Sequence, residues 1–175
     1  MDGNLIDRRL AEHFGLARPT RWVTRARPKI DRIACPWLIL SFIDPDAVIL
    51  YAPTEQVFEV AQREGAVAFD IPGAPFTHAG EACSFDAFIQ GFGLDDPGLE
   101  ALAPIVRGAD TDRHELAPQA SGLHALSLGL TLLYDDDQAL LEQGLIIYDA
   151  LYAWATRARG ERHDWRPDAM TGAAR

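Results

Sequence analysis

The stretch that decides the fold covers residues 21–40 and reads RWVTRARPKIDRIACPWLIL. Its first five residues alternate polar and large side chains, which is typical of a β-strand, and a proline then ends the pattern because proline cannot continue a paired strand. Asp31 is a candidate N-cap for a helix over 32–43. Pro36 favours a helix that begins close to Cys35, since proline is best tolerated near a helix start. The stretch predicts a strand, a charged turn and a helix.

The same alternation of elements continues to residue 71. We expect a strand over 47–51, a helix over 55–64 that stops at Gly65, and a strand over 66–71. Strand, helix, strand, helix, strand is the order found in sheets with right-handed crossovers. The first half of the chain therefore predicts a small three-stranded sheet, parallel or mixed.

The second half of the chain is predicted to be rich in helices. Apolar residues recur at helical spacing over 85–92, 99–106, 119–134 and 138–157, with Ser84 as the expected cap of the first of these helices. The expected fold class is therefore α/β, with a small sheet and a helix-rich C-terminal half. A length of 175 residues predicts one domain over 1–175, in which the segments 1–19 and 159–175 are the candidates for mobile ends.

Charge and cysteine content narrow the class of function. The net charge of −10 opposes binding of nucleic acid by this chain alone, although a local cluster of cations can still hold a small anion. Two cysteines are too few for a secreted disulfide scaffold, and no signal peptide or membrane-length apolar run is visible. We expect a cytoplasmic protein with reduced thiols and no membrane partner, and the sequence leaves its oligomeric state open.

The charged turn is the first candidate site. It carries Arg27, Lys29 and Arg32 around Asp31, after the carboxyl end of a strand and before a helix N-terminus. Ligands usually bind at this place in α/β sheets, and a helix N-terminus adds free N–H donors for an anion. The four residues therefore predict an anion site. The alternative is a solvated turn in which arginine–aspartate pairs hold the loop.

A second candidate site combines residues from two loops. His78, Glu81 and Cys83 lie within six residues and offer the ligand types that suit Mn, Fe or Zn. Asp110 and Asp112 follow a helix and add carboxylate oxygens. These five residues predict a site for a divalent transition metal ion. The alternative is a polar loop with a hydrogen-bonded histidine and a buried cysteine, beside an ordinary helix-ending turn.

Cys35 is a candidate catalytic thiol. A thiol at a helix N-terminus among arginine and lysine residues has a lowered pKa and therefore thiolate character. The neighbouring Trp37 and Leu38 also fit the start of a buried helix, where the thiol would be inert.

Three other histidines are not assigned to a site. His124 stands in an apolar helical pattern, which is typical of a core histidine, and His13 and His163 fall in the two terminal segments.

The residues from 22 to 39, WVTRARPKIDRIACPWLI, resemble the opening signature of the chromate-resistance domain family, the ChrB-type C-terminal domain. The resemblance extends to about residue 154 through the segments FDIPG at 69–73, CSF at 83–85, VRGAD at 106–110, APQA at 117–120, GL at 122–123 and YD at 148–149, together with His78. It points to nine positions as functional candidates: Arg27, Lys29, Asp31, Arg32, Cys35, His78, Glu81, Cys83 and Asp110.

The resemblance implies a stand-alone bacterial domain that is linked to chromate resistance and the stress response. Together with the two candidate sites, it favours a domain that binds or senses a divalent metal ion and a small oxyanion such as chromate, a tetrahedral dianion that suits arginine donors. The alternative is an enzyme, either a metal-dependent hydrolase or a thiol-redox enzyme that acts on a small anionic substrate.

Overall fold

The computed structural model describes residues 3–15 and 18–162 and confirms the expected α/β class. The strands are β1 (Arg21–Arg25), β2 (Val48–Ala52) and β3 (Val67–Ala68). The α-helices are α1 (Gly3–Phe14), α2 (Asp31–Leu38), α3 (Val57–Glu64), α4 (Ser84–Phe92), α5 (Pro97–Asp110), α6 (Ala120–Leu133) and α7 (Asp137–Arg157). A π-helical turn η1 (Ile39–Ile43) extends α2, and the 3-10 turns η2 (Thr54–Gln56) and η3 (His114–Leu116) precede α3 and α6. Most of the segment 159–175, which we expected to be a mobile end, lies outside the described residues.

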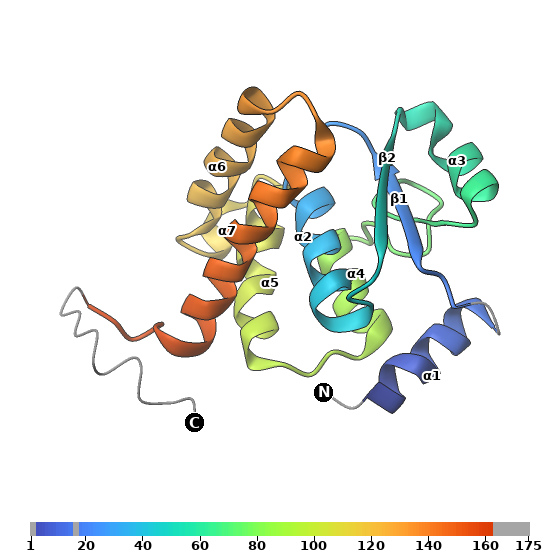
Figure 1. Ribbon diagram of the computed structural model, residues 1–175. Helices are drawn as coiled ribbons and strands as arrows, with labels where there is room; N and C mark the ends of the chain where they lie inside the picture. Colours follow the sequence, from blue (N-terminus) through green and yellow to red (C-terminus); the bar gives the residue numbers. More distant parts are fainter. Residues whose placement is uncertain (1–2, 16–17, 163–175) are drawn as a thin grey trace.

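The sheet is parallel, with the strand order β2-β1-β3 and β1 in the centre. Helix α3 lies on one side of the strands, and α2, α4, α5, α6 and α7 lie on the other side (Figure 1). The third strand is shorter than the expected 66–71, because Asp70 has a positive φ of 50° and turns the chain out of the sheet. This turn places Asp70 at the carboxyl edge of the sheet.

The alternation of side chains along β1 builds a core on each face. Trp22 belongs to the large core under the helical half, and Val23 belongs to the small core under α3, where it joins Val57 and Val60. Successive residues of a strand point to opposite faces, so neighbouring positions reach different layers. Helix α1 adds Ile6 and Leu10 to the large core. The buried part of β1 ends at Thr24, and Arg25 at its carboxyl end leads into the charged turn.

Helix α2 begins four residues earlier than Pro36 led us to expect. It starts at Asp31, so Pro36 lies inside the helix and cannot donate to the carbonyl group of Arg32. The hydroxyl group of Tyr51 donates to that carbonyl at 2.9 Å, which compensates for the missing bond. The early start brings Asp31 into the first turn of the helix, and its side chain makes no cap of α2.

Two other helix boundaries differ from expectation. Cys83, rather than Ser84, is the N-cap of α4, and its N–H donates to Asp86 Oδ2 at 2.9 Å. Helix α5 extends to Asp110 and is tied to α4 by two hydrogen bonds of 2.7 Å from Arg107 to Asp86. These contacts fix the end of α5 relative to the start of α4, where the candidate site lies.

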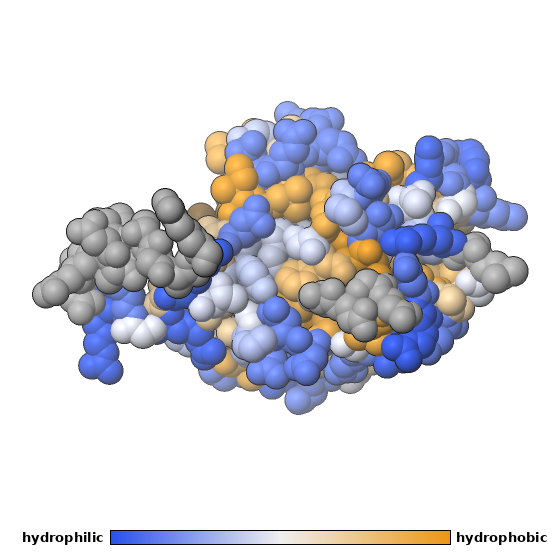
Figure 2. Space-filling model, turned by 60° about the horizontal axis from the view of Figure 1, so that its bottom comes forward, coloured by the Kyte–Doolittle hydropathy of each residue, from blue (hydrophilic) through white to orange (hydrophobic). Residues whose placement is uncertain are grey.

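The surface mixes polar and apolar side chains. On the face shown in Figure 2, apolar side chains gather towards the middle and hydrophilic ones surround them. Within the described part of the chain, no helix combines the length and the apolar composition that crossing a membrane requires.

The close packing of α2 against α7 gives a first prediction. A Cβ atom on Gly144 of α7 would lie 2.4 Å from Ile33 Cγ2 of α2, and Ile33 is fully buried. We expect Gly144→Ala to lower the free energy of unfolding by about 1–3 kcal/mol, since overpacking must displace a core side chain. Urea unfolding measures the change.

The matched control is Gly129→Ala on α6, where no heavy atom lies within 4 Å of the added Cβ. Alanine favours the helix by about 1 kcal/mol over glycine, so this variant is expected to be as stable as the wild type or more stable. A Gly144→Ala protein with wild-type stability would contradict the tight α2–α7 contact.

Candidate functional site

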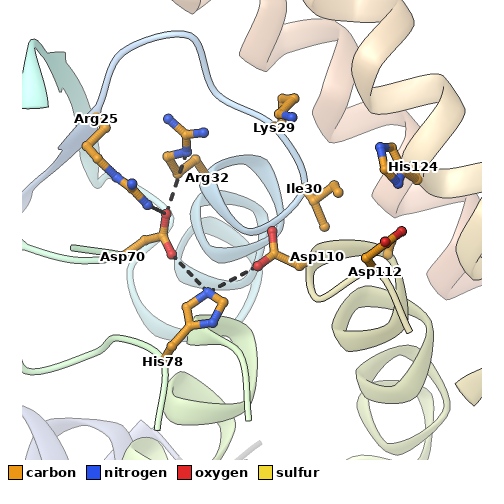
Figure 3. Close-up of a pocket in the computed structure, with 10 residues that line it drawn as sticks. Arg25, Lys29, Ile30, Arg32, Asp70, His78, Asp110, Asp112 and His124 are labelled. Carbon is orange, nitrogen blue, oxygen red and sulfur yellow. Dashed lines mark hydrogen bonds and ion pairs between the residues drawn. The ribbon is translucent and has the colours of Figure 1, made fainter. Parts of the chain in front are cut away.

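A cavity of about 250 Å3 opens where the charged turn meets the end of α5. It is lined by Arg25, Lys29, Ile30, Arg32, Asp70, His78, Ala109, Asp110, Asp112 and His124 (Figure 3). The residues come from the end of β1, the start of α2, the loop after β3, the end of α5 and helix α6. Three parts of the sequence, residues 25–32, 70–78 and 109–124, therefore contribute to one cavity.

The imidazole ring of His78 is the centre of the acidic part of this cavity. Its Nε2 atom lies 3.1 Å from Asp110 Oδ2, 3.4 Å from Asp31 Oδ2 and 3.5 Å from Asp70 Oδ1. Asp31 and Asp70 are almost completely buried, whereas the side chain of His78 is 42% exposed. One imidazole nitrogen thus faces three carboxylates, two of which have almost no access to solvent.

Two helix starts hold these carboxylates in place. The N–H of Ser84, at the start of α4, donates to Asp31 Oδ2, and its hydroxyl group donates to Asp70 Oδ1 at 2.7 Å. The N–H of Asp31, at the start of α2, donates to Asp110 Oδ1 at 3.4 Å. The positive ends of both helices therefore stabilise carboxylates that come from other elements.

Asp70 has the most complete set of partners among the three. Arg25 Nη2 lies 2.8 Å and Arg32 Nε 3.5 Å from Asp70 Oδ2. Burial raises the pKa of Asp70, but hydrogen bonding to His78, Ser84 and Arg25 outweighs burial, so the pKa is lowered overall. Asp70 is therefore an ionised anchor that orients its neighbours.

Asp31 and Asp110 are less well neutralised. Burial raises the pKa of Asp31, and the partial compensation by His78 does not reverse the shift. Burial and the negative charges of Asp31 and Asp70 raise the pKa of Asp110 to about 7. Asp31 Oδ1 is buried and has no hydrogen-bond partner among the described residues. The region between these two carboxylates can accept further positive charge.

In the absence of another cation, His78 supplies that charge as an imidazolium. The interactions with Asp31 and Asp70 raise its pKa to about 10. A divalent metal ion could replace this proton, because neutral imidazole and carboxylate oxygens are metal ligands.

The geometry of the donor atoms fits a metal ion. Asp31, His78 and Asp110 each offer a donor atom, and the three atoms lie within 4.8 Å of one another. Metal–ligand bonds of about 2.0–2.2 Å place two ligand atoms about 3–3.5 Å apart on one ion. The distances of 3.1 Å and 3.4 Å from His78 to Asp110 and Asp31 lie in that range. Asp31 is thus placed with the candidate metal ligands, whereas the sequence pattern assigned it to the anion site.

Lys29 and Arg32 line the cavity as the sequence pattern suggested, but Arg27 does not. The guanidinium group of Arg27 donates to the carbonyl oxygens of Thr131, Tyr134 and Asp135 at the end of α6. Arg27 therefore anchors the turn and is not one of the residues that line the cavity.

The start of α2 has few donors left for an anion. The N–H of Asp31 faces Asp110, and the N–H groups of Arg32, Ile33 and Ala34 donate to carbonyls of the preceding turn. An oxyanion in this cavity would therefore have to depend on side chains. The ammonium group of Lys29 is available, because no partner is found for it in the described part of the chain.

Three of the metal ligands expected from the sequence are not grouped with His78, namely Glu81, Cys83 and Asp112. Reciprocal hydrogen bonds between Ala79 and Ala82 form a tight turn that carries Glu81 at its tip, where its side chain is 85% exposed and pairs with Arg113 at 3.2 Å. Cys83 is buried as the cap of α4, and burial raises the pKa of its thiol. Asp112 has a positive φ of 56° after the end of α5, and its side chain is 88% exposed.

Cys35 is in the opposite environment to the one expected for a catalytic thiol. It is fully buried in the large core, where burial first and the negative charges of Asp31 and Asp70 next raise its pKa. Burial and these acidic groups thus outweigh any effect of the cations of the turn.

His124 is also placed differently from the expected core position. It is only partly buried, lines the cavity and faces His114 across 3.1 Å. Arg25 and Asp70 are the site residues that sequence reasoning missed. The motif FDIPG, in which a glycine and a proline follow Asp70, signals a turn at a strand end and could have drawn attention to it.

Comparison with known proteins gives the chain a family. The sequence profile described as "ChrB, C-terminal domain" matches residues 22–155. The curated protein named "Protein ChrB" from Cupriavidus metallidurans is 38% identical over 133 residues, which is 75% of this chain and 40% of that protein. The chain thus spans less than half the length of this relative. No solved structure matches the chain.

The buried thiols give a second prediction. We expect Cys35 and Cys83 to remain unmodified by iodoacetamide in the folded protein and to react fully in guanidinium chloride, because burial keeps both thiols neutral and inaccessible. Mass spectrometry of each cysteine peptide measures the extent of reaction. Faster alkylation of Cys35 in the folded protein than of a free thiol would contradict this account.

Proposed function

Because this chain belongs to the ChrB C-terminal domain family, which is associated with chromate resistance, we propose that it binds a divalent transition metal ion and a small oxyanion in one cavity. The observation that carries the proposal is the convergence of Asp31, His78 and Asp110 at donor-atom distances that suit one ion. The oxyanion part rests on the cations that line the same cavity.

The metal ion would be held by Asp31, His78 and Asp110. Two carboxylates and one neutral imidazole carry a charge of −2, which a divalent ion neutralises, and they suit Mn, Fe or Zn. Three protein ligands leave coordination positions open for water or an anion. Asp70 would keep the ligands in place through its contacts with Ser84 and His78.

Arg25, Lys29 and Arg32 form a cationic wall of the cavity. The oxyanion would lie between the metal and this wall. Lys29 has no acidic partner in the described residues, whereas Arg25 and Arg32 share Asp70. Chromate and sulfate are both tetrahedral dianions, and arginine and lysine donors suit each of them. Linkage to chromate resistance favours chromate as the physiological member of this class.

The structure argues against one of the two enzyme alternatives and is compatible with the other. A thiol-redox enzyme needs an accessible thiolate, and both cysteines are buried with raised pKa values. A metal-dependent hydrolase would use the same metal ligands as the proposed binding domain. Turnover of a panel of phosphoesters by the metal-loaded protein separates hydrolysis from binding.

The metal proposal predicts opposite effects of one substitution on affinity and stability. Asp110→Asn removes a ligand charge, so we expect Mn2+ affinity to fall at least about tenfold, or ~1.4 kcal/mol. The same change should stabilise the metal-free protein above pH 7. The folded pKa of about 7 exceeds the ordinary value of 3.8, so ionisation of Asp110 costs stability as the pH rises between these values.

Calorimetric titration with Mn2+ and thermal unfolding at pH 8 measure the two effects. His78→Ala should also weaken Mn2+ binding, while His13→Gln, which removes an imidazole from α1 away from the cavity, should not. Unchanged Mn2+ affinity in both Asp110→Asn and His78→Ala, or no Mn2+ binding by the wild type, would overturn the metal assignment.

The oxyanion proposal predicts a contrast between a cation that lines the cavity and one that does not. Lys29→Ala should weaken chromate and sulfate binding to the metal-loaded protein roughly tenfold or more, since it removes a charge-assisted hydrogen bond. Arg63→Ala on α3 should leave the affinity unchanged, because Arg63 pairs with Glu64 and does not line the cavity. Equal effects of the two substitutions, measured by calorimetry, would count against a specific oxyanion position.

A further inference from the structure

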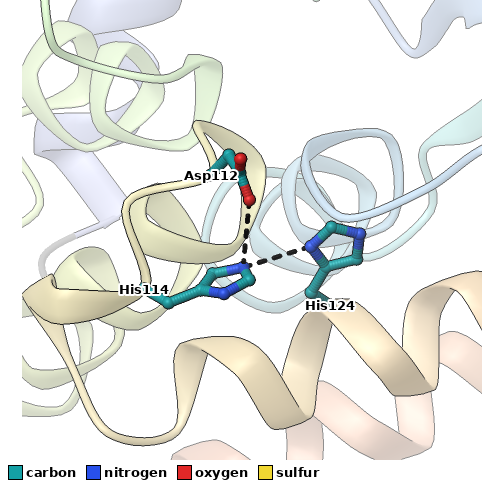
Figure 4. A group of neighbouring side chains, drawn as sticks. All are labelled: Asp112, His114 and His124. Atoms are coloured by element: carbon teal, nitrogen blue, oxygen red, sulfur yellow. Dashed lines mark hydrogen bonds and ion pairs between the residues drawn. The ribbon is translucent and has the colours of Figure 1, made fainter.

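A second group of side chains that could ligate a metal ion consists of Asp112, His114 and His124 (Figure 4), and Asp112 and His124 also line the cavity. His114 Nε2 is 3.1 Å from His124 Nδ1 and 3.7 Å from Asp112 Oδ1. These three donor atoms all lie within 4.8 Å of one another. His114 belongs to η3, His124 belongs to α6, and Asp112 lies in the turn that follows α5. The group is therefore built from three elements that meet beside the cavity.

The group shares no residue with the first cluster and differs from it in two respects. It offers two imidazoles and one carboxylate, whereas Asp31, His78 and Asp110 offer one imidazole and two carboxylates. It is also partly open to solvent, with Asp112 88% and His114 36% exposed. A cation could thus enter this group without displacing a buried ion pair.

The contact between the two histidines has a specific chemical meaning. Two ring nitrogens 3.1 Å apart can share one proton, because one nitrogen donates and the other accepts. Two nitrogens on one metal ion with bonds of about 2.0–2.1 Å lie at a similar distance. A metal ion can therefore replace the shared proton with small movements of the rings.

We propose that Asp112, His114 and His124 form a second metal site, selective for late divalent transition metals such as Cu2+, Ni2+ or Zn2+. Imidazole ligands suit these ions, and their affinity for nitrogen sites rises along the series to Cu2+. The oxygen-rich first cluster is better suited to Mn2+. This proposal goes beyond the proposed function, because it requires no metal at His78.

Occupancy of the second site would act on the cavity. Asp112 and His124 line the cavity together with Lys29, so an ion held by them adds positive charge beside the proposed oxyanion position. The ion would also link the segment after α5 to α6. Loading this site is expected to raise the unfolding temperature of the whole domain, since the ion binds the folded chain.

The test uses substoichiometric Cu2+ on the full, tag-free chain. Electron paramagnetic resonance of the wild type is expected to show two imidazole nitrogens on the ion. His114→Gln and His124→Gln should each leave one nitrogen and weaken Cu2+ binding at least about tenfold, or ~1.4 kcal/mol. Asp112→Asn should weaken binding while keeping both nitrogens, and asparagine tolerates the positive φ of this position.

Two control variants separate this site from the first one. Asp110→Asn should leave the two-nitrogen Cu2+ spectrum unchanged, and His13→Gln should do the same. The proposal is overturned if His114→Gln and His124→Gln retain the wild-type spectrum and affinity, or if Asp110→Asn or His13→Gln removes the two-nitrogen signal. Thermal unfolding of each metal-free variant verifies that a lost signal does not come from a lost fold.

Discussion

The site depends on the way Ser84 holds two buried carboxylates at the start of α4. Its N–H group and its hydroxyl group bind Asp31 and Asp70, which reach this point from α2 and from the loop after β3. A buried carboxylate costs several kcal/mol unless it is paired and hydrogen-bonded, so the strand end, the charged turn and α4 must meet in one arrangement. Arg25 and Arg32 also pair with Asp70. The imidazole ring of His78 faces the other two acids, Asp31 and Asp110.

This arrangement leaves positive charge unevenly distributed. Asp70 pairs with two arginines, and its pKa is lowered. Asp31 and Asp110 share one imidazole, and their pKa values are raised. The metal proposal follows from that imbalance, because an ion bound at His78 would neutralise the two acids that the protein leaves under-compensated. The cationic wall would then face a metal with open positions, which would allow one small cavity to hold a cation and an oxyanion together.

Local patterns in the sequence predicted the elements better than the site. The alternation in β1 and the helical spacing of α3 to α7 gave the α/β class, and four of the residues that the sequence patterns singled out, Lys29, Arg32, His78 and Asp110, line the cavity. Arg25 and Asp70 were missed because their pairing joins positions 45 residues apart. Such a contact depends on how the turn after β3 folds back.

Residues whose surroundings differ from the expected ones do so for the same reason. Glu81 follows His78 closely in sequence, but the tight turn between Ala79 and Ala82 sends their side chains in different directions. The prediction of a reactive Cys35 rested on the charge of the neighbouring turn, whereas burial in the core, the alternative that Trp37 and Leu38 suggested, has the opposite effect on the thiol. The orientation of side chains in loops and the depth of a helix in the fold are tertiary properties.

Diffraction from crystals soaked in Mn2+, with anomalous scattering measured to locate the ion, tests the central claim most directly. The account predicts an anomalous peak about 2.0–2.2 Å from His78 Nε2 and from one carboxylate oxygen each of Asp31 and Asp110. Well-ordered crystals at saturating Mn2+ that show no peak within bonding distance of His78, with its ring still held between the carboxylates, would contradict the account.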